Sequence, residues 1–473
     1  MAAALTRVQL GRLSVDRFSG VLPPERWQEF QATRTRTAEA MRGRVVWNLN
    51  STAAGGGVAE ELSSLIAYAT DAGVDARWLV VGADPAFFVL TKRIHNNLHG
   101  APGDGGDLGA VERELYERAL KPAAEELAGL VRPGDVVILH DPQTAGLVQT
   151  VKDAGVRAVW RCHVGIDQPH PLAQRAWDFL HPYVEPVDTW IMSRSAFAWQ
   201  GWDESRLRII PPSIDAFSVK NAPMSGADVH GVLAAAGLLR NHGDAPAPYR
   251  AAMGERHRVT VQHGAEMVEE EPLPPGADLV LQVSRWDRLK DPSGVMQGFV
   301  EHAAPHSDAH LMLVGPQAVA DDPESAVVLA EATAQWRELD SAMRRRVHLA
   351  ALSMADVEEN ALVVNAIQRH AAVVVQKSLA EGFGLTVSEA MWKSRPVVAS
   401  RVGGIQDQIE DGRSGVLVDD PHDLRAYGEA VRRLLADPDL RGRLGDAARE
   451  RVVDLFLATR HLEQWAAVVS GSS

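Results

Sequence analysis

Cysteine is nearly absent from this chain of 473 residues, in which Cys162 is the single example. One cysteine excludes a disulfide within the chain and fits a reducing compartment, so we expect a cytoplasmic protein. Long apolar runs are also missing, since no stretch approaches the roughly 18 uninterrupted apolar residues of a membrane span. Polar residues break the apolar N-terminus early, which does not resemble a signal peptide.

Positive charge is in deficit. The formal net charge is −14, and no basic patch interleaved with aromatic side chains is visible. This balance argues against nucleic acids or anionic membranes as partners, although it is compatible with local basic pockets for phosphate. Hydrophobic residues make up 46% and charged residues 23%, as in ordinary globular proteins, and the length predicts two domains.

Several motifs of common enzyme classes are missing as well. The sequence contains no HExxH, no CxxC and no carboxylate cluster, so we expect no built-in metal site. The pattern G-x-x-x-x-G-K-[ST] does not occur, and Gly55-Gly56-Gly57 is not the spaced G-x-G-x-x-G pattern. Between a strand and a helix, this glycine triplet fits a phosphate cradle of backbone N–H groups, and it fits a tight turn equally well.

Strands alternate with helices in both halves of the chain. We expect strands at residues 45–50, 76–81, 135–139, 158–163 and 189–192, and again at 278–283, 309–314, 347–349, 371–375 and 396–399. Such alternation predicts a parallel sheet with right-handed crossovers in each half. The first forty residues are interpreted as a polar, helix-rich preamble. Residues 222–275 lack a strong period and are interpreted as a linker with a partly helical insertion, in which the acidic run 269–271 forms a solvated loop.

The segment EGFGLTVSE, residues 381–389, lies between an apolar strand and an amphipathic stretch. Gly382 and Gly384 permit a sharp turn and a close approach of the backbone to a ligand. The N–H groups that begin the following helix then face an anion. Two carboxylates beside such a helix end, Glu381 and Glu389, suggest hydroxyl groups as their partners. The combination predicts a sugar nucleotide as the ligand.

A cationic loop, SRWDRLKD, follows the first strand of the second half. It carries Arg285, Arg288 and Lys290 at the carboxyl end of a strand, where α/β folds bind ligands. Arginine and lysine are suited to phosphate oxygens. A solvated charged loop is the alternative interpretation.

Two polar triplets end strands of the first half, His140-Asp141-Pro142 and Arg161-Cys162-His163. Cys162 and His163 are adjacent on a strand and point to opposite faces, which argues against a nucleophilic Cys–His pair. A structural hydrogen-bonding role is the alternative for His140 and His163.

These segments together resemble the retaining nucleotide-sugar glycosyltransferases of the GT-B type. The stretch EGFGLTVSEAMWKSRPVVASRVGGI carries the resemblance to that broad class. In the first half, NSTAAGGGVAEEL, FFVLTKRIHNNLHG, LHDPQ, WRCH and IIPPSID occur in the order found in the trehalose glycosyltransferring synthases. The resemblance covers about residues 40–220 and 278–465, and it implies an α/β GT-B fold of two Rossmann-like domains facing each other across a cleft.

The resemblance also implies a domain organisation. Residues 1–220 would form the N-terminal Rossmann-like acceptor domain, 221–276 a linker or insertion, and 277–454 the C-terminal nucleotide-sugar-binding domain. A C-terminal helix at about 455–473 would cross back onto the N-terminal domain.

The implied reaction transfers glucose from a nucleoside-diphosphate glucose to free glucose and forms α,α-trehalose with retention. In the absence of an obvious nucleophile, the acceptor would attack the face that the diphosphate leaves, through an oxocarbenium-like state. The leaving phosphate would accept the proton, and the protein would supply positioning and charge stabilisation. Whether the donor carries uridine, adenosine or guanosine is left open.

Residue roles follow from the resemblance. The implied catalytic residues are Glu381, Arg285, Lys290 and His163. The implied donor-binding residues are Glu389 at the ribose, with Gly382, Phe383, Gly384, Leu385, Gly56 and Gly57 near sugar and diphosphate. The implied acceptor-binding residues are Asp141, His140 and Asn96.

Other functions remain as alternatives. A trehalose phosphorylase would use glucose 1-phosphate and would not need Glu389 as a ribose clamp, and another GT-B glucosyltransferase would use a different acceptor. A non-enzymatic sugar-nucleotide sensor is disfavoured by the intact set of charged residues. We expect no tightly bound cofactor, with Mg²⁺ left open as an assisting ion. We expect no nucleic-acid or membrane partner, and a homodimer is left open.

Overall fold

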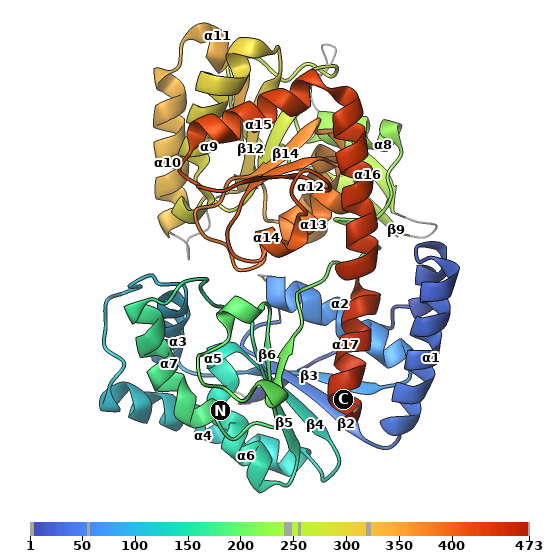
Figure 1. The fold of residues 1–473 in the computed structure, drawn as a ribbon, viewed down its shortest axis with the longest axis vertical. Coiled ribbons are helices and arrows are strands. Elements are labelled where there is room, and N and C mark those ends of the chain that lie inside the picture. The colour runs from blue at the N-terminus through green and yellow to red at the C-terminus, as the bar shows by residue number, and fades with distance from the viewer. Residues whose placement is uncertain (1–3, 54–56, 241–247, 254–256, 318–322, 472–473) are drawn as a thin grey trace. The chain divides into compact units, whose positions relative to one another are not determined.

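The computed structural model describes residues 4–53, 57–240, 248–253, 257–317 and 323–471, which form two compact units (Figure 1). Unit 1 contains Met1–Ser213 and Phe456–Ser473, and unit 2 contains Ile214–Leu455. Each unit has its own sheet and its own hydrophobic core. The chain therefore leaves unit 1 after Ser213 and returns to it at Phe456.

Unit 1 is built on a sheet whose described strands follow the order β1-β3-β2-β4-β5-β6-β7, and all neighbours are parallel except β1 and β3. The strands are β1 Leu5–Val8, β2 Val45–Asn50, β3 Asp75–Val81, β4 Val136–His140, β5 Arg157–Cys162, β6 Thr189–Met192 and β7 Leu207–Ile209. The helices are α1 Pro24–Ala40, α2 Gly57–Asp71, α3 Pro85–Leu98, α4 Ala110–Leu130, α5 Asp141–Thr144, α6 Val148–Asp153, α7 Pro171–Val184 and α17 Ala458–Ser470. Strands β2, β4 and β5 are covered on both faces, and for this reason their sequences lack the alternation of a half-exposed strand.

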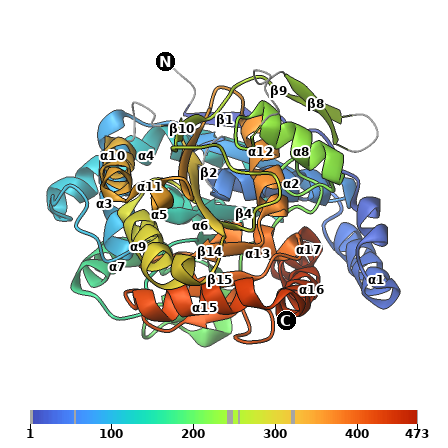
Figure 2. The same cartoon turned by 90° about the horizontal axis from the view of Figure 1, so that it is seen from above.

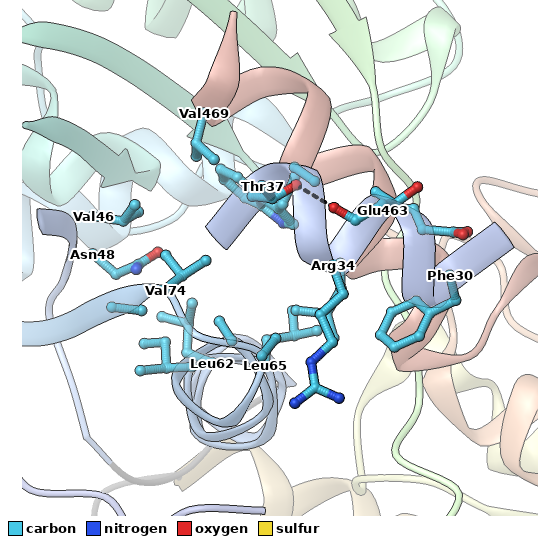
Figure 3. A pocket seen from close by; sticks show the side chains of 18 residues that line it. Phe30, Arg34, Thr37, Val46, Asn48, Leu62, Leu65, Val74, Glu463 and Val469 are labelled. Carbon is cyan, nitrogen blue, oxygen red and sulfur yellow. Dashed lines mark hydrogen bonds between the residues drawn. The ribbon is translucent and has the colours of Figure 1, made fainter. Parts of the chain in front are cut away.

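Helices cover the two faces of this sheet in separate groups. The larger core joins α3, α4 and α7 to one face, while α1, α2 and α17 pack over the other. Between these last three helices lies a cavity of about 80 Å³. Figure 3 shows Leu62 and Leu65 of α2, Val46 of β2 and Val469 of α17 around it, with the charged groups of Arg34 and Glu463 at its border.

Unit 2 contains a second sheet, with the order β10-β13-β12-β11-β14-β15-β16 among its described strands. All neighbours are parallel except β10 and β13. The strands are β10 Glu266–Val268, β11 Leu279–Val283, β12 His310–Pro316, β13 Val347–Leu352, β14 Val373–Gln376, β15 Val397–Ser400 and β16 Val416–Val418. The helices are α8 Gly226–Ala235, α9 Pro292–Gly298, α10 Pro323–Glu338, α11 Ser341–Arg344, α12 Val357–His370, α13 Leu385–Trp392, α14 Ile405–Gln408, α15 Leu424–Ala436 and α16 Pro438–Leu455.

The segment expected to be a linker, residues 221–276, is part of unit 2 and holds regular structure. It contains α8, an antiparallel hairpin of β8 Tyr249–Met253 and β9 His257–Val261, and the edge strand β10. Figure 2 shows the hairpin beside α8, which itself packs on α12. The acidic run 269–271 is a loop, as expected, in which Glu270 and Glu271 are exposed, whereas Glu269 is partly buried and bonds to the buried His348 at 2.8 Å.

The N-terminal preamble also differs from expectation. It includes the long helix α1, but residues 5–8 form β1, which pairs antiparallel with β3 at the sheet edge. At the other end of the chain, α17 belongs to unit 1, where it packs on α1 and α2. Among the helices that the structure describes, none combines the length and apolar character needed to cross a membrane.

Candidate functional site

In unit 2, the turn between β14 and α13 brings the backbone of two loops very close together. Gly384 is the N-cap of α13 and has a φ of 84°, a left-handed conformation that favours glycine. The N–H of Gly404 donates to the carbonyl of Gly382 at 2.9 Å, and a Cβ on Gly403 would lie 1.6 Å from the carbonyl oxygen of Glu381. The predicted sharp turn is therefore present, and a second glycine pair holds it in place.

The carboxylate of Glu381 lies beside the ammonium group of Lys290. Lys290 Nζ donates to Glu381 Oε2, and the Ser378 hydroxyl lies 3.4 Å from the same oxygen. The Lys290 and Glu381 side chains are only 14% and 12% exposed. The structure thus joins two residues that are 91 positions apart in the sequence and that were both predicted to be catalytic.

The cations of the 284–291 loop have different surroundings. Arg288 pairs with Glu331 on α10 at 2.7 Å and is well exposed. Arg285 is 64% exposed and pairs with Asp287 at 3.1 Å. Lys290, and not Arg288, therefore lies beside the EGFG segment.

Glu389 is almost completely buried on α13. Its Oε1 atom lies 3.5 Å from Lys220 Nζ. Its Oε2 atom is buried and has no hydrogen-bond partner within the described ranges. A buried carboxylate oxygen without a donor is costly, which makes this atom a strong candidate for a ligand hydroxyl.

In unit 1, the ends of β4 and β5 bring His140, Asp141 and His163 together. His140 Nδ1 lies 3.2 Å from His163 Nε2, and the backbone N–H of His163 donates to Asp141 Oδ1 at 2.7 Å. Asp141 has a φ of 62°, which is unusual for a residue with a side chain. This strained position aims the carboxylate back at the end of β5.

Arg161 determines which nitrogen of His163 carries the proton. Its Nε–H donates to His163 Nε2 at 3.0 Å, so a neutral His163 is protonated on Nδ1. Burial, followed by the charge of Arg161, lowers the pKa of His163 well below its usual value and that of His140 to about 3. Burial raises the pKa of Asp141 to about 7. The two histidines are therefore neutral at neutral pH.

Behind these residues, Glu61 of α2 forms a buried polar cluster with Arg161 and His461. Its carboxylate lies 3.0 Å from His461 Nδ1, accepts the Ser213 N–H at 2.9 Å and lies 3.6 Å from Arg161. Burial raises the pKa of Glu61, but His461 and Arg161 outweigh burial and lower it well below the usual value. This cluster fixes the guanidinium that orients His163.

The remaining predicted residues lie elsewhere or are not described. Asn96 is on α3, where its carbonyl accepts the Ala101 N–H at 2.9 Å, and α3 packs beside α5. Gly57 begins α2, whereas Gly56 lies outside the described residues. Cys162 is buried, and its thiol donates to the carbonyl of Val164 at 3.3 Å. The thiol therefore bonds to the backbone within the larger hydrophobic core, which agrees with the argument against a Cys–His pair.

Both halves of the chain match known family models. Residues 48–199 match the model described as trehalose synthase, N-terminal domain, and residues 265–451 match glycosyl transferases group 1. The chain is 35% identical over 462 residues to the trehalose synthase of Rubrobacter xylanophilus, and the match covers 97% of each protein.

The chain belongs to the trehalose synthase family.

This member of the trehalose synthase family is also similar to more distant proteins. It is 26% identical to the trehalose phosphorylase of Pleurotus pulmonarius over 86% of this chain and 54% of that protein. Its structure resembles the sucrose-phosphate synthase of Thermosynechococcus elongatus with a TM-score of 0.62 and 19% identity, over 90% of this chain and 98% of that one. The predicted GT-B fold class is confirmed.

The sequence did not reveal the roles of several residues that support the candidate site. Glu61 lies in the quoted block NSTAAGGGVAEEL but was given no role, because its partners Arg161 and His461 are distant in the sequence. Asp291 directly before Pro292 carried a signal, since Asp followed by Pro is typical of a helix N-cap. No sequence signal distinguished Lys377, because a lysine that follows an apolar strand is usually exposed to solvent.

Proposed function

We propose that this chain is a retaining glycosyltransferase that moves glucose from a nucleoside-diphosphate glucose to free glucose and forms α,α-trehalose. Membership of the trehalose synthase family supports the reaction class. The observation that carries the proposal within the site is the buried Glu389 Oε2 atom, which has no hydrogen-bond partner in the described part of the chain. Ribose hydroxyls would donate to it and remove the cost of burying it.

The neighbouring residues suit the rest of such a donor. Lys290 and Arg285 would neutralise the diphosphate as it leaves, and the α13 N-terminus at Gly384 and Leu385 would present backbone N–H groups to phosphate. Glu381 would accept hydroxyls of the donor glucose. Its contact with Lys290 places a carboxylate and a cation side by side, as the junction between sugar and phosphate requires.

The histidine pair of unit 1 suits a neutral supporting role beside Asp141. His163 Nδ1 lies 4.0 Å from Glu61 Oε2, and both ring nitrogens of His140 have protein partners, so the Asp141 carboxylate is the group that would bind acceptor hydroxyls. Asn96 would complete the acceptor contacts. The acceptor hydroxyl would itself form the new bond to the anomeric carbon on the face where the bond to the diphosphate breaks, so no side chain would act as a nucleophile. The leaving phosphate would take the hydroxyl's proton, so no side chain would act as the base.

The decisive experiment incubates the purified protein with glucose and, separately, UDP-glucose, ADP-glucose, GDP-glucose or glucose 1-phosphate. We expect α,α-trehalose and a nucleoside diphosphate, identified by chromatography and by proton NMR of the anomeric linkage. Trehalose formed only from glucose 1-phosphate would move the assignment to a phosphorylase. A different disaccharide, or none, would overturn the acceptor. Parallel reactions with Mg²⁺ and with a chelator test the assisting ion.

A further inference from the structure

We propose that the ion pair between the buried Lys377 and the partly exposed Asp291 positions Lys290 for the reaction. The inference rests on the proposed function, in which Lys290 meets the diphosphate. Neither partner would touch the substrate, so both are positioning residues. Gln282 supports the same arrangement from the end of β11.

Lys377 is a buried cation with a specific anionic partner. It follows β14 directly, is 1% exposed, and its Nζ donates to Asp291 Oδ2. A buried ammonium cannot be left unpaired without a large desolvation cost, so this pairing constrains both residues. Because the ammonium is buried and engaged, Lys377 is not a further phosphate ligand.

Asp291 has a left-handed backbone conformation, which is unfavourable for a residue with a side chain unless surrounding contacts stabilise it. Its φ of 48° and ψ of 53° are left-handed, and its side chain caps α9 by accepting the Gly294 N–H at 3.0 Å. A Cβ on Gly294 would lie 2.2 Å from the Asp291 carboxylate, so a glycine is needed there. Asp291 immediately follows Lys290, and the backbone of Lys290 is therefore fixed on one side.

Further hydrogen bonds tie the same loop to the segment after β14. Gln282 Nε2 donates to the Lys290 carbonyl at 2.9 Å, while Gln282 Oε1 accepts the Lys377 N–H at 3.3 Å. The Leu379 N–H donates to the Leu289 carbonyl at 2.7 Å. These bonds join the backbone that carries Lys290 to the backbone that leads into Glu381. The Lys377–Asp291 pair is the charged member of this connection.

A mutant cycle measured by turnover tests the proposal, with Lys377→Met, Lys290→Ala and the double variant. We expect Lys377→Met to lower kcat about tenfold to hundredfold in the wild-type background. In the Lys290→Ala background its effect should fall below about twofold, because Lys290 is no longer there to be positioned. Equal losses in both backgrounds would overturn the proposal and indicate a general structural role.

Lys393→Met is the matched control. Lys393 is also buried in unit 2, but its Nζ donates to Asn221 Oδ1 at 3.0 Å, to Gln368 Oε1 at 2.8 Å and to the Glu389 carbonyl at 3.1 Å, away from the 284–291 loop. Its effect on kcat should be the same with and without Lys290. If Lys377→Met does not fold, Gln282→Leu replaces it in the cycle, since it removes the bond to the Lys290 carbonyl without leaving a buried charge.

The cycle separates this inference from the proposed function. If Lys290→Ala alone keeps normal turnover, the assigned role of Lys290 fails, and the positioning proposal fails with it. If Lys290→Ala is impaired while Lys377→Met is additive with it, the proposed function stands and only the positioning role is overturned.

Discussion

Glu381 and Glu389 belong to one nine-residue motif, but their surroundings differ. Glu381 already has a cationic partner in Lys290, whereas Glu389 Oε2 is buried without a donor within the described residues. The contact with Lys290 favours a role for Glu381 in the reaction itself, when negative charge develops on the leaving diphosphate of the proposed donor. The surroundings of Glu389 favour a fixed hydroxyl contact with the ligand. Two identical side chains therefore lead to different experimental predictions.

Replacing Glu389 by Gln should weaken binding of the nucleoside diphosphate about tenfold to hundredfold. The expected size is that of a hydrogen bond to a charged group, about 1.5–3 kcal/mol. Isothermal titration calorimetry with the product nucleotide measures it. Glu429→Gln is the control, because Glu429 lies in an exposed pair with Arg425 on α15 and should leave affinity unchanged. Equal affinity of wild type and Glu389→Gln would contradict the ribose role.

Replacing Glu381 by Ala should abolish transfer while leaving the fold intact. The variant removes the carboxylate that contacts Lys290 and that would face the proposed donor sugar, so kcat should fall by at least about a hundredfold. Product formation is measured by chromatography, and circular dichroism checks the fold. Near-normal turnover in a folded variant would remove Glu381 from the catalytic set.

At the level of elements, the sequence predicted the internal strands well and the edge strands poorly. Strands β2, β4, β11 and β14 are buried apolar runs, which stand out against the helices around them. The edge strands β1 and β10 have mixed sequences such as LTRV and EMV, since only one neighbour and one face constrain them.

The site followed the same rule. The turn at Gly384 could be predicted because its glycines and carboxylates are neighbours in the sequence. The cluster of Glu61, Arg161 and His461 could not, because it is assembled from α2, β5 and α17 by the fold itself. Local chemistry is visible in a sequence, whereas partners joined by tertiary packing are not.

The cavity under α1, α2 and α17 gives a prediction for these elements. Ala466 of α17 lines it, and Ala466→Leu should add about 1 kcal/mol to the free energy of unfolding by filling apolar space. Denaturant titration measures the change. Ala123→Leu on α4 is the contrast, because Ala123 is fully buried outside this cavity and overpacking there should cost about 1–3 kcal/mol. A loss of stability for Ala466→Leu would contradict the prediction.

For the whole molecule, the buried histidines of unit 1 predict a loss of stability in acid. The pKa of His140 is lowered to about 3 and that of His461 to about 4, so the unfolded chain binds protons below its pKa of about 6.5 that the folded chain does not. The contribution of His140 and His461 to the free energy of unfolding is therefore fully present above about pH 6.5 and decreases as the pH falls from about 6.5 to 4. Asp141, with its raised pKa, acts oppositely over a similar range but is a single group.

Thermal unfolding at pH 7 and pH 5 tests this prediction. We expect the unfolding temperature of unit 1 to be lower at pH 5, and His461→Gln to reduce the difference between the two pH values. An unchanged difference in His461→Gln would show that other groups cause the acid sensitivity. His422→Gln provides a control, because His422 lies in an exposed turn.

The interrupted order of unit 1 along the chain has a consequence during synthesis on the ribosome. Residues 214–455 lie between its two parts, and at about 5–20 residues per second their translation takes about 10–50 s. Throughout that interval Glu61 has no His461 beside it, and the apolar face that α17 covers stays open to water. Unit 2 is therefore the first part of the molecule that can be completed. The nascent first 213 residues have to avoid aggregation and proteolysis until their final helix arrives.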